Sequence, residues 1–322
     1  MKQYLDLVDR ILKEGELKEN RTGVKTYSIS GTIFEHDMHN GFPLITTKKV
    51  AVHAIKVELE GFIKGITDKK WFQDRKCNIW NEWCNPEKVP YGHDKETKIK
   101  MMEERDLGPI YGWQWRHFGA EYQGIKNEED NAELPDVKCR SDVDSNQVPL
   151  NASLANMFEK ESYKNKGIDQ LEILVKKLKA NPDDRRMIVS AWNPEDLDKM
   201  ALPPCHMSYQ VTVTNGKLNL MWNQRSVDTM LGLPFNIASY GILLHLLAKE
   251  ARLKEGRLVG FLGDTHIYEN HIEGAREQLN REPYYLPILE TEKFTSLFDW
   301  TYQDTKFVNY EHHPKIKFDV VV

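Results

Sequence analysis

Residues 209–222 read YQVTVTNGKLNLMW, and this stretch decides the fold class. Polar and apolar residues alternate on both sides of Asn215-Gly216, and both turn residues tolerate the positive φ angles that a tight hairpin needs. The stretch therefore predicts two antiparallel strands, Tyr209–Thr214 and Lys217–Trp222, joined by a two-residue turn.

Helix and strand patterns lie on both sides of this hairpin. Apolar residues recur at helical spacing in four segments, which predicts helices at Gln3–Glu14, Val52–Lys64, Ile168–Lys179 and Phe235–Leu253. We expect one more helix at Ile267–Arg281 and further strands at Thr26–Phe34 and Met187–Trp192. Because the patterns interleave, the fold class is α/β (α+β), and we expect one domain over residues 1–322. Two polar stretches, at about 85–105 and 121–166, are interpreted as surface insertions.

The composition excludes several classes of protein. The chain has 322 residues, with 44 Lys and Arg against 49 Asp and Glu, which argues against a nucleic-acid coat and against a polybasic membrane binder. The four cysteines are unevenly spaced, and neither a signal peptide nor a membrane span is recognisable, so we expect a reduced, soluble, cytoplasmic protein. The sequence lacks the GxxxxGK[ST], GxGxxG and HExxH motifs, and no metal is expected.

The first candidate for chemistry is Leu202-Pro203-Pro204-Cys205-His206. Two prolines fix the backbone directly before the cysteine. A buried structural cysteine would also fit this pattern, but charged and polar residues flank it along the chain. If the hairpin folds back, Arg225 approaches Cys205, and a guanidinium beside a thiol favours the nucleophilic thiolate.

Arginines gather around the same region. Arg185-Arg186 lies upstream, Arg225-Ser226 lies downstream, and Arg21 stands in the polar turn Asn20–Gly23. Arginine pairs often serve as surface charges, yet guanidinium groups also fork onto phosphate oxygens, and a serine hydroxyl adds a donor. The combination favours a phosphate-bearing ligand.

Several long blocks resemble the thymidylate synthase family. The segment from Arg185 to His206 is similar to the active-site signature of that family. Its other blocks match, in one order, at Asn20–Gly23, Asp106–Gly112, Gln224–Asp228, Leu231–Tyr240 and Gly263–Tyr268. The resemblance covers nearly the whole chain except about 85–105 and 121–166. It implies a mixed β-sheet covered by helices and a homodimer formed by sheet-to-sheet packing.

The resemblance also implies a reaction. The family converts dUMP to dTMP, with 5,10-methylenetetrahydrofolate as one-carbon donor and reductant. Cys205 would add to C6 of uracil and make C5 nucleophilic. The proton-handling network would contain Glu58, His206 and Tyr111, and the catalytic set would also include Arg225 and Asp228.

The implied dUMP site has three parts. Phosphate would bind Arg21, Arg225 and Ser226, with Arg185 and Arg186 supplied by the partner subunit. Asn236 would read the base, because its amide can meet both N3–H and O4 of uracil, whereas cytosine presents the opposite pattern. The remaining expected dUMP ligands are Gln224, His266 and Tyr268, the last two on the sugar hydroxyl.

The implied folate site lies beside it. Its expected residues are Lys48, Ile79, Trp80, Trp83, Leu202, Asp228, Leu231, Gly232, Phe235 and Val322. Lys48 and Lys49 would meet the glutamate tail of the folate, and Val320-Val321-Val322 would close over the site.

The chain departs from the family pattern at Asn20, where Asp is usual, at Asn223, where Tyr is common, and at Glu60-Gly61, where an apolar residue and Trp are usual. Because Glu60 and Gly61 flank Glu58, one alternative is a dUMP 5-hydroxymethylase, in which water rather than hydride quenches the intermediate. A second alternative is an inactive homologue that binds nucleotide or RNA for regulation. The intact Cys205 and the acidic net charge argue against it.

Overall fold

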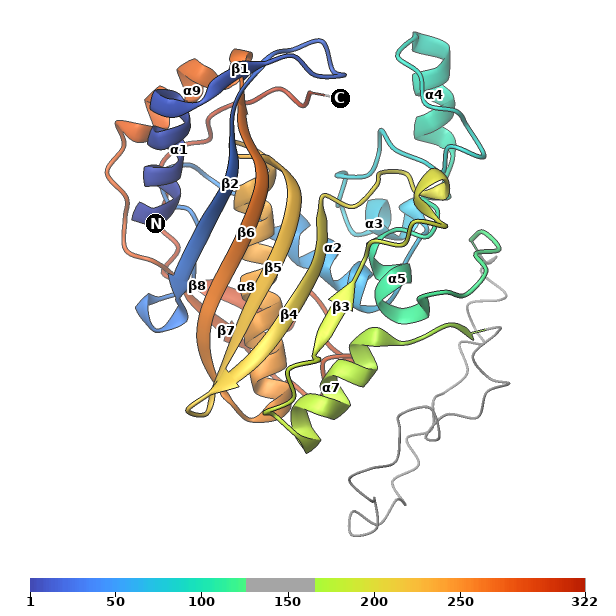
Figure 1. Ribbon diagram of the computed structural model, residues 1–322, viewed down its shortest axis with the longest axis vertical. Helices are drawn as coiled ribbons and strands as arrows, with labels where there is room; N and C mark the ends of the chain where they lie inside the picture. The colour runs from blue at the N-terminus through green and yellow to red at the C-terminus, as the bar shows by residue number, and fades with distance from the viewer. Residues whose placement is uncertain (126–165, 322) are drawn as a thin grey trace.

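A six-stranded mixed sheet forms one layer of the protein, with the strand order β1-β2-β6-β5-β4-β3 (Figure 1). The computed structural model describes residues 1–125 and 166–321. The strands of this sheet are β1 (Glu16–Lys18), β2 (Thr26–Asp37), β3 (Ile188–Ser190), β4 (His206–Thr214), β5 (Lys217–Asp228) and β6 (Lys254–Tyr268). A separate antiparallel pair is formed by β7 (Ile288–Thr291) and β8 (Thr305–Val308).

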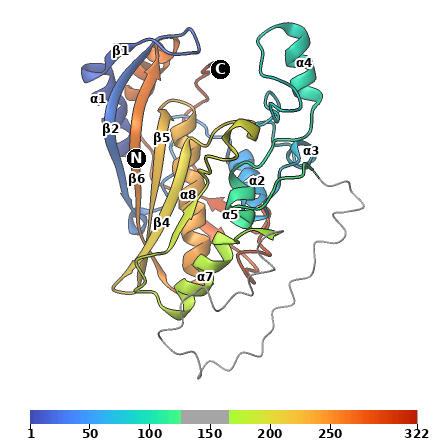
Figure 2. The same ribbon diagram turned by 45° about the vertical axis from the view of Figure 1, so that its right-hand side comes forward.

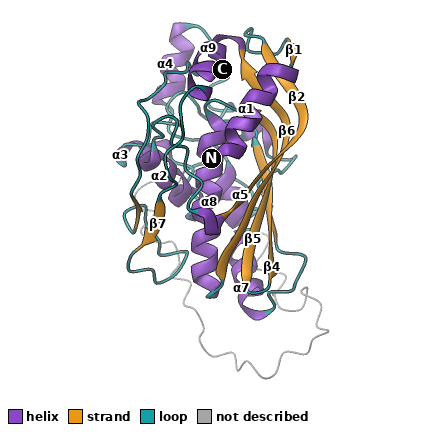
Figure 3. Ribbon diagram, turned by 90° about the vertical axis from the view of Figure 1, so that its left-hand side faces the viewer, coloured by secondary structure: helices purple, strands orange, loops and turns teal. Residues whose placement is uncertain are grey.

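Helices form the second layer. Figure 3 shows the sheet edge-on with the labelled helices on one side of it. They are α1 (Lys2–Glu14), α2 (Val52–Ile63), α3 (Lys69–Asp74), α4 (Lys95–Glu103), α5 (Tyr111–His117), α7 (Gln170–Ala180), α8 (Gly232–Ala251) and α9 (Ile272–Leu279). Figures 1 and 2 show α4 apart from the others, at the end of the molecule where the C-terminal residues lie.

Helix α8 is the centre of the core. It connects β5 to β6, which are parallel neighbours, because a parallel pair needs a crossover connection. Leucines such as Leu243, Leu244 and Leu247 are buried, and burial of each such side chain contributes about 2 kcal/mol. The helix ends where Arg252 adopts a left-handed conformation, with φ of 57°.

The predicted hairpin is confirmed. Tyr209 pairs with Trp222 and Thr214 pairs with Lys217, and Asn215 and Gly216 have φ of 51° and 71°. The predicted helices at the positions of α1, α2 and α7 are also confirmed. Helix α8 begins at Gly232, three residues before the predicted Phe235, because Pro234 fits the first turn of a helix.

The prediction of a helix over Ile267–Arg281 is partly wrong. Ile267 and Tyr268 end strand β6, a 3₁₀ turn follows at Glu269–His271, and only Ile272–Leu279 is α-helical. The sequence did not predict β6, because glycines interrupt its alternation. Gly260 is one of them, and any side chain there would overlap the ring of Trp222 on the neighbouring strand.

The two polar stretches have different outcomes. The first, at about 85–105, contains the exposed helix α4. Of the second, residues 126–165 lie outside the described residues. Among the described helices, none combines the length and the apolar character needed to cross a membrane.

Candidate active site

Cys205 lies directly before β4, where Arg225 and Tyr111 hold its loop. The guanidinium of Arg225 donates to the carbonyl oxygens of Pro203 and Pro204, at 2.8 and 2.9 Å. The backbone N–H of Arg225 donates to the carbonyl of Cys205 at 2.8 Å, and the backbone N–H of Cys205 donates to the hydroxyl of Tyr111 at 2.8 Å. The hairpin therefore brings Arg225 to the cysteine loop, as the sequence predicted.

Arg225 and Arg21 favour the Cys205 thiolate as predicted, but burial has the larger and opposite effect in the protein without ligands. Burial raises the pKa of the Cys205 thiol above its ordinary value, while Arg225 and Arg21 oppose this rise. Desolvation of the charged form outweighs the two guanidinium groups, one of which is engaged by the proline carbonyls. Cys205 is therefore a thiol at rest, and its proton must leave when sulfur attacks.

His206, Tyr111 and Tyr240 form a buried cluster behind the cysteine. The His206 ring stacks on Tyr111 with 4.3 Å between ring centroids, and its Nδ1 lies 2.9 Å from the hydroxyl of Tyr240. Burial lowers the pKa of His206 to about 3, so the imidazole is neutral. Tyr240, which sequence reasoning took for core, contacts His206 here and closes one of the matched blocks.

Glu58 is the titratable carboxyl group of this region. It lies on α2, and burial raises its pKa to about 7, against the opposing influence of the Trp80 indole. The Trp80 Nε1 is buried and has no hydrogen-bond partner among the described residues. A carboxyl group with a pKa near neutrality can both accept and donate a proton, which is the property of a general acid–base group.

Glu60 and Gly61, the two departures beside Glu58, lie on different sides of α2. Glu60 is 2% exposed and accepts from Lys64 Nζ at 2.5 Å and from the backbone N–H of Tyr302 at 2.8 Å. Residues two apart on a helix point about 200° apart, so Glu60 lies on the opposite side of α2 from Glu58. Gly61 makes room for the ring of Phe72, which any side chain at position 61 would overlap. Gly61 is three residues from Glu58, on the neighbouring side of the helix, and has no side chain, so neither departure places a polar group beside the Glu58 carboxyl.

A chain of amides fixes Asn236. Trp222 Nε1 donates to Gln224 Oε1 at 3.1 Å, and Gln224 Nε2 donates to Asn236 Oδ1 at 3.0 Å. Gln224 is 3% exposed, while Asn236 is partly exposed on the first turns of α8. The amide of Asn236 is therefore held with its Nδ2 donors and one oxygen lone pair remaining for a ligand.

The expected phosphate ligands are divided between two places. Arg21 and Arg225 both act electrostatically on Cys205, and Ser226 follows Arg225 on β5. Arg185 instead lies beside Gln210, whose side chain donates to its carbonyl at 3.2 Å. Gln210 is five residues along β4 from Cys205, a distance on the order of 15 Å in a strand. Arg186 is exposed and pairs with Asp184 at 3.0 Å.

His266 and Tyr268 lie at the end of β6. Their rings meet edge to face at 5.2 Å, and His266 stands opposite Asp228 in the sheet register. The neighbouring Asp264 is held by His266, Lys18 and Ser28, which keep the pKa of its carboxyl far below the ordinary value.

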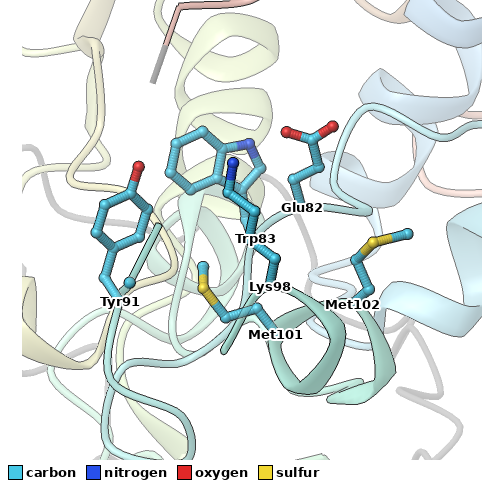
Figure 4. A pocket seen from close by; sticks show the side chains of 7 residues that line it. Glu82, Trp83, Tyr91, Lys98, Met101 and Met102 are labelled. Atoms are coloured by element: carbon cyan, nitrogen blue, oxygen red, sulfur yellow. The ribbon is translucent and has the colours of Figure 1, made fainter. Parts of the chain in front are cut away.

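The two tryptophans of the expected folate site, Trp80 and Trp83, each contact another aromatic ring. Trp80 is 4% exposed and meets Tyr111 at 6.2 Å, while Trp83 is partly exposed and stacks on Tyr91 with centroids 5.8 Å apart and planes 11° apart. Figure 4 shows the hollow beside Trp83, which Tyr91 and side chains of α4 line. Tyr91 and Lys69, whose buried Nζ donates to the carbonyls of Asn81 and Met101, were not recognised in the sequence, because no motif there marked them.

The remaining expected folate residues lie in different settings. Asp228 Oδ1 accepts the N–H groups of Met230 and Leu231 at 3.0 and 3.1 Å and so shapes the turn before α8. The others that the structure describes are Ile79, which is exposed, and the partly exposed Leu202, Leu231, Gly232 and Phe235. Val322 lies outside the described residues.

Lys48 differs most from its expected role. Its side chain is 5% exposed, and its Nζ donates to the carbonyl of Met230 and lies 4.4 Å from the centroid of the Phe318 ring. Lys49 is exposed. The Lys48 ammonium is thus engaged within the protein here, and its contact with the folate tail stays a prediction.

The thiols and acidic groups give no metal centre. Cys77, Cys84 and Cys205 are free thiols. Within residues 1–125 and 166–321, His, Cys, Asp and Glu side chains nowhere gather in a group of three or more that could hold a metal ion.

Comparisons with known proteins agree with the motifs. A family model described as thymidylate synthase matches residues 2–322. The chain is 42% identical over 320 residues, 99% of its length, to a protein of Paramecium tetraurelia named bifunctional dihydrofolate reductase-thymidylate synthase, and it spans 61% of that relative. It is 38% identical to the thymidylate synthase of Mycoplasma pneumoniae over 334 aligned residues, which cover the whole of both chains.

Proposed function

The chain belongs to the thymidylate synthase family, and we propose from this premise that it converts dUMP to dTMP with 5,10-methylenetetrahydrofolate. The observation that carries the proposal is the setting of Cys205. The loop that carries this partly exposed thiol is hydrogen-bonded by Arg225 and Tyr111. The charge of Arg21 acts on the thiol and lowers its pKa. A nucleophile beside cationic groups that can bind phosphate is what the chemistry of a nucleotide requires.

The first steps use this chain's residues and the uracil ring. Arg21, Arg225 and Ser226 bind the phosphate, and Asn236 hydrogen-bonds to N3–H and O4 of the base. The Cys205 thiol loses its proton, sulfur bonds to C6, and the electron pair of the C5=C6 bond moves toward O4 as an enolate. The Nδ2 donors of Asn236 stabilise the charge that develops on O4.

The folate fits the residues that face it. The Trp80 indole lies beside the Glu58 carboxyl, and Trp83 and Asp228 offer a ring face and hydrogen-bonding groups that suit a planar heterocycle. When bound, methylenetetrahydrofolate supplies the one-carbon unit and the hydride. Glu58, with its pKa of about 7, accepts and relays the C5 proton, and His206 and Tyr111 orient the surrounding hydrogen bonds. The S–C6 bond then breaks and Cys205 regains its proton.

A second subunit completes the proposed site. The sheet face away from the helices carries exposed apolar side chains, including Ile33 (60% exposed) and its register partner Phe261 (43% exposed). Burial of this face against its own copy would place Arg185 and Arg186 of one subunit at the phosphate of the other, which explains why they lie far from Cys205 in their own chain. We propose a homodimer for this reason. The free thiols support a cytoplasmic location.

The alternatives are not favoured. Glu60 points away from Glu58 and is held by Lys64 and Tyr302, and Gly61 has no side chain, so neither departure adds a polar group beside the proton-handling residue. An inactive homologue would not need an intact Cys205, Tyr111 and Asn236 set.

One assay separates these functions. The protein is incubated with dUMP and methylenetetrahydrofolate, dihydrofolate absorbance is followed, and the nucleotide is identified by mass spectrometry. Formation of dTMP with equimolar dihydrofolate is expected. Hydroxymethyl-dUMP with tetrahydrofolate would establish the hydroxymethylase, and the absence of turnover by folded protein would establish the inactive homologue.

A further inference from the structure

The segment that follows β8 returns to the sheet and packs its Phe318 against helix α9. Phe318 is 8% exposed, and its ring lies directly over Gly274. A Cβ atom at position 274 would be only 2.5 Å from Cε1 of that ring. The glycine therefore creates the space that the ring occupies.

His271 fixes the residue after Phe318. Its Nε2 lies 2.8 Å from the carbonyl oxygen of Asp319, and its ring meets the Phe318 ring at 5.1 Å and 64°. Since a carbonyl can only accept, Nε2 carries the proton and donates. His271 is 1% exposed, so it is a preformed part of the core rather than a surface contact.

Lys48 also contacts the Phe318 ring. Its ammonium lies 4.4 Å from the ring centroid and donates to the carbonyl of Met230. Burial lowers the pKa of Lys48 to about 8, and the nearby Asp228 opposes this change. A cation with few solvent contacts gains more from a ring face and a carbonyl than an exposed one does.

The carbonyl that Lys48 binds belongs to a wall of the expected folate site. Met230 lies in the turn that Asp228 organises before α8, and Leu231 and Gly232 follow it. One buried ammonium thus touches both the C-terminal segment and this turn.

We propose that Gly274, His271 and Lys48 form a seat for Phe318 that fixes the C-terminal segment, and that Lys48 is a positioning residue joining this segment to the folate turn. The role in folate binding rests on the proposed function. The existence of the seat does not, because its contacts are all within the chain.

The direct test measures hydrogen exchange of the full chain without ligands. Gly274→Ala and Phe318→Ala should each raise amide exchange of residues 316–321 by about tenfold, because each removes the docked ring. The double variant should exchange no faster than either single one, because both changes remove the same contact. Arg276→Ala, on the exposed side of α9, is the matched control and should leave exchange unchanged. Unchanged exchange in the two single variants, or additive effects in the double variant, would overturn the seat.

The role of Lys48 has its own readout. Lys48→Met keeps the length of the side chain and removes its charge, and it should raise exchange both in residues 228–232 and in residues 316–321. A change in one segment only would contradict the joining role.

Kinetics then test the link to folate. Phe318→Ala should raise KM for methylenetetrahydrofolate by about fivefold to tenfold and leave the Kd for dUMP within about twofold. If wild type turns over but this split is absent, the inference fails while the proposed function stands. If wild type does not turn over, the proposed function fails, and hydrogen exchange still decides whether the seat exists.

Discussion

The hydroxyl of Tyr111 accepts the backbone N–H of Cys205 at 2.8 Å, across 94 positions of sequence. This bond ties α5 to the loop that carries the nucleophile. It also satisfies a donor that the two preceding prolines leave without a regular strand partner. The position of the sulfur therefore depends on a tyrosine in a different block of the sequence.

Tyr111→Phe should lower kcat by about tenfold, because the Cys205 N–H loses its hydrogen-bond partner and the loop that positions the sulfur is held less firmly. Tyr209→Phe is the control: its buried hydroxyl has no hydrogen-bond partner within the described chain, so its loss should cost little. Steady-state kinetics of both variants check this. Equal activities would show that the Tyr111 bond has no catalytic consequence.

The carboxyl of Glu58 predicts a pH dependence of stability. Its pKa is about 7 in the folded protein against about 4.5 for an ordinary glutamate carboxyl, so the folded state binds more protons between these values. The stabilisation is complete below about pH 4.5 and is lost as pH rises through about 7. Wild type should therefore lose free energy of unfolding relative to Glu58→Gln over this window, by on the order of 2 kcal/mol. Urea titrations at several pH values measure it, and parallel curves would refute the raised pKa.

Glu58→Gln should also lower kcat by at least about 100-fold, because an amide cannot accept the C5 proton. Kinetics therefore test the role of Glu58 independently of the stability measurement. Activity close to wild type would exclude Glu58 from the proton path.

Asn236→Asp should move nucleotide preference from dUMP toward dCMP, because a protonated carboxyl offers the complementary donor and acceptor pattern to cytosine. Gln224 would still hold the side chain from behind. Asn236→Ala is the control, since it removes the discriminating group: it should weaken dUMP binding and bring the two affinities closer without creating a preference for dCMP. Binding of each nucleotide, measured by calorimetry, decides, and an unchanged ratio in Asn236→Asp would rule out the reading role.

The proposed shared site predicts complementation between inactive variants. Arg186→Ala and Cys205→Ala homodimers should each have little activity, but subunit exchange gives mixed dimers with one intact site. Statistical mixing should restore about a quarter of wild-type activity. Sedimentation verifies the dimers, and no recovery from a mixture of exchanging dimers would place Arg186 outside the partner's site.

Local signals predicted the parts of the fold that local chemistry determines. Asn215-Gly216 determines its hairpin by itself, because the turn needs two positive φ angles. Strand β6 was not predicted, because Gly260 is there for the Trp222 ring of the neighbouring strand rather than for the strand itself.

The features of the site also divide into those that motifs predict and those that depend on tertiary packing. Motif blocks identified Cys205, Tyr111, Arg225 and Asn236, and the structure brings Tyr111 and Arg225 onto the Cys205 loop. The raised pKa of Cys205 and the burial of Lys48 were not predictable, because both depend on how distant segments exclude water. The stacking of Tyr91 on Trp83 also arises from tertiary packing alone.

The covalent bond between Cys205 and the pyrimidine is the central claim, and intact-protein mass spectrometry tests it most directly. The probe is 5-fluoro-dUMP with methylenetetrahydrofolate, since fluorine at C5 cannot leave as the proton does and the adduct should persist. We predict that wild type gains the mass of the nucleotide and the folate, that the modified peptide contains Cys205, and that Cys205→Ala gains nothing. An unmodified wild-type protein that still turns over dUMP, or a modified Cys205→Ala protein, would contradict the account.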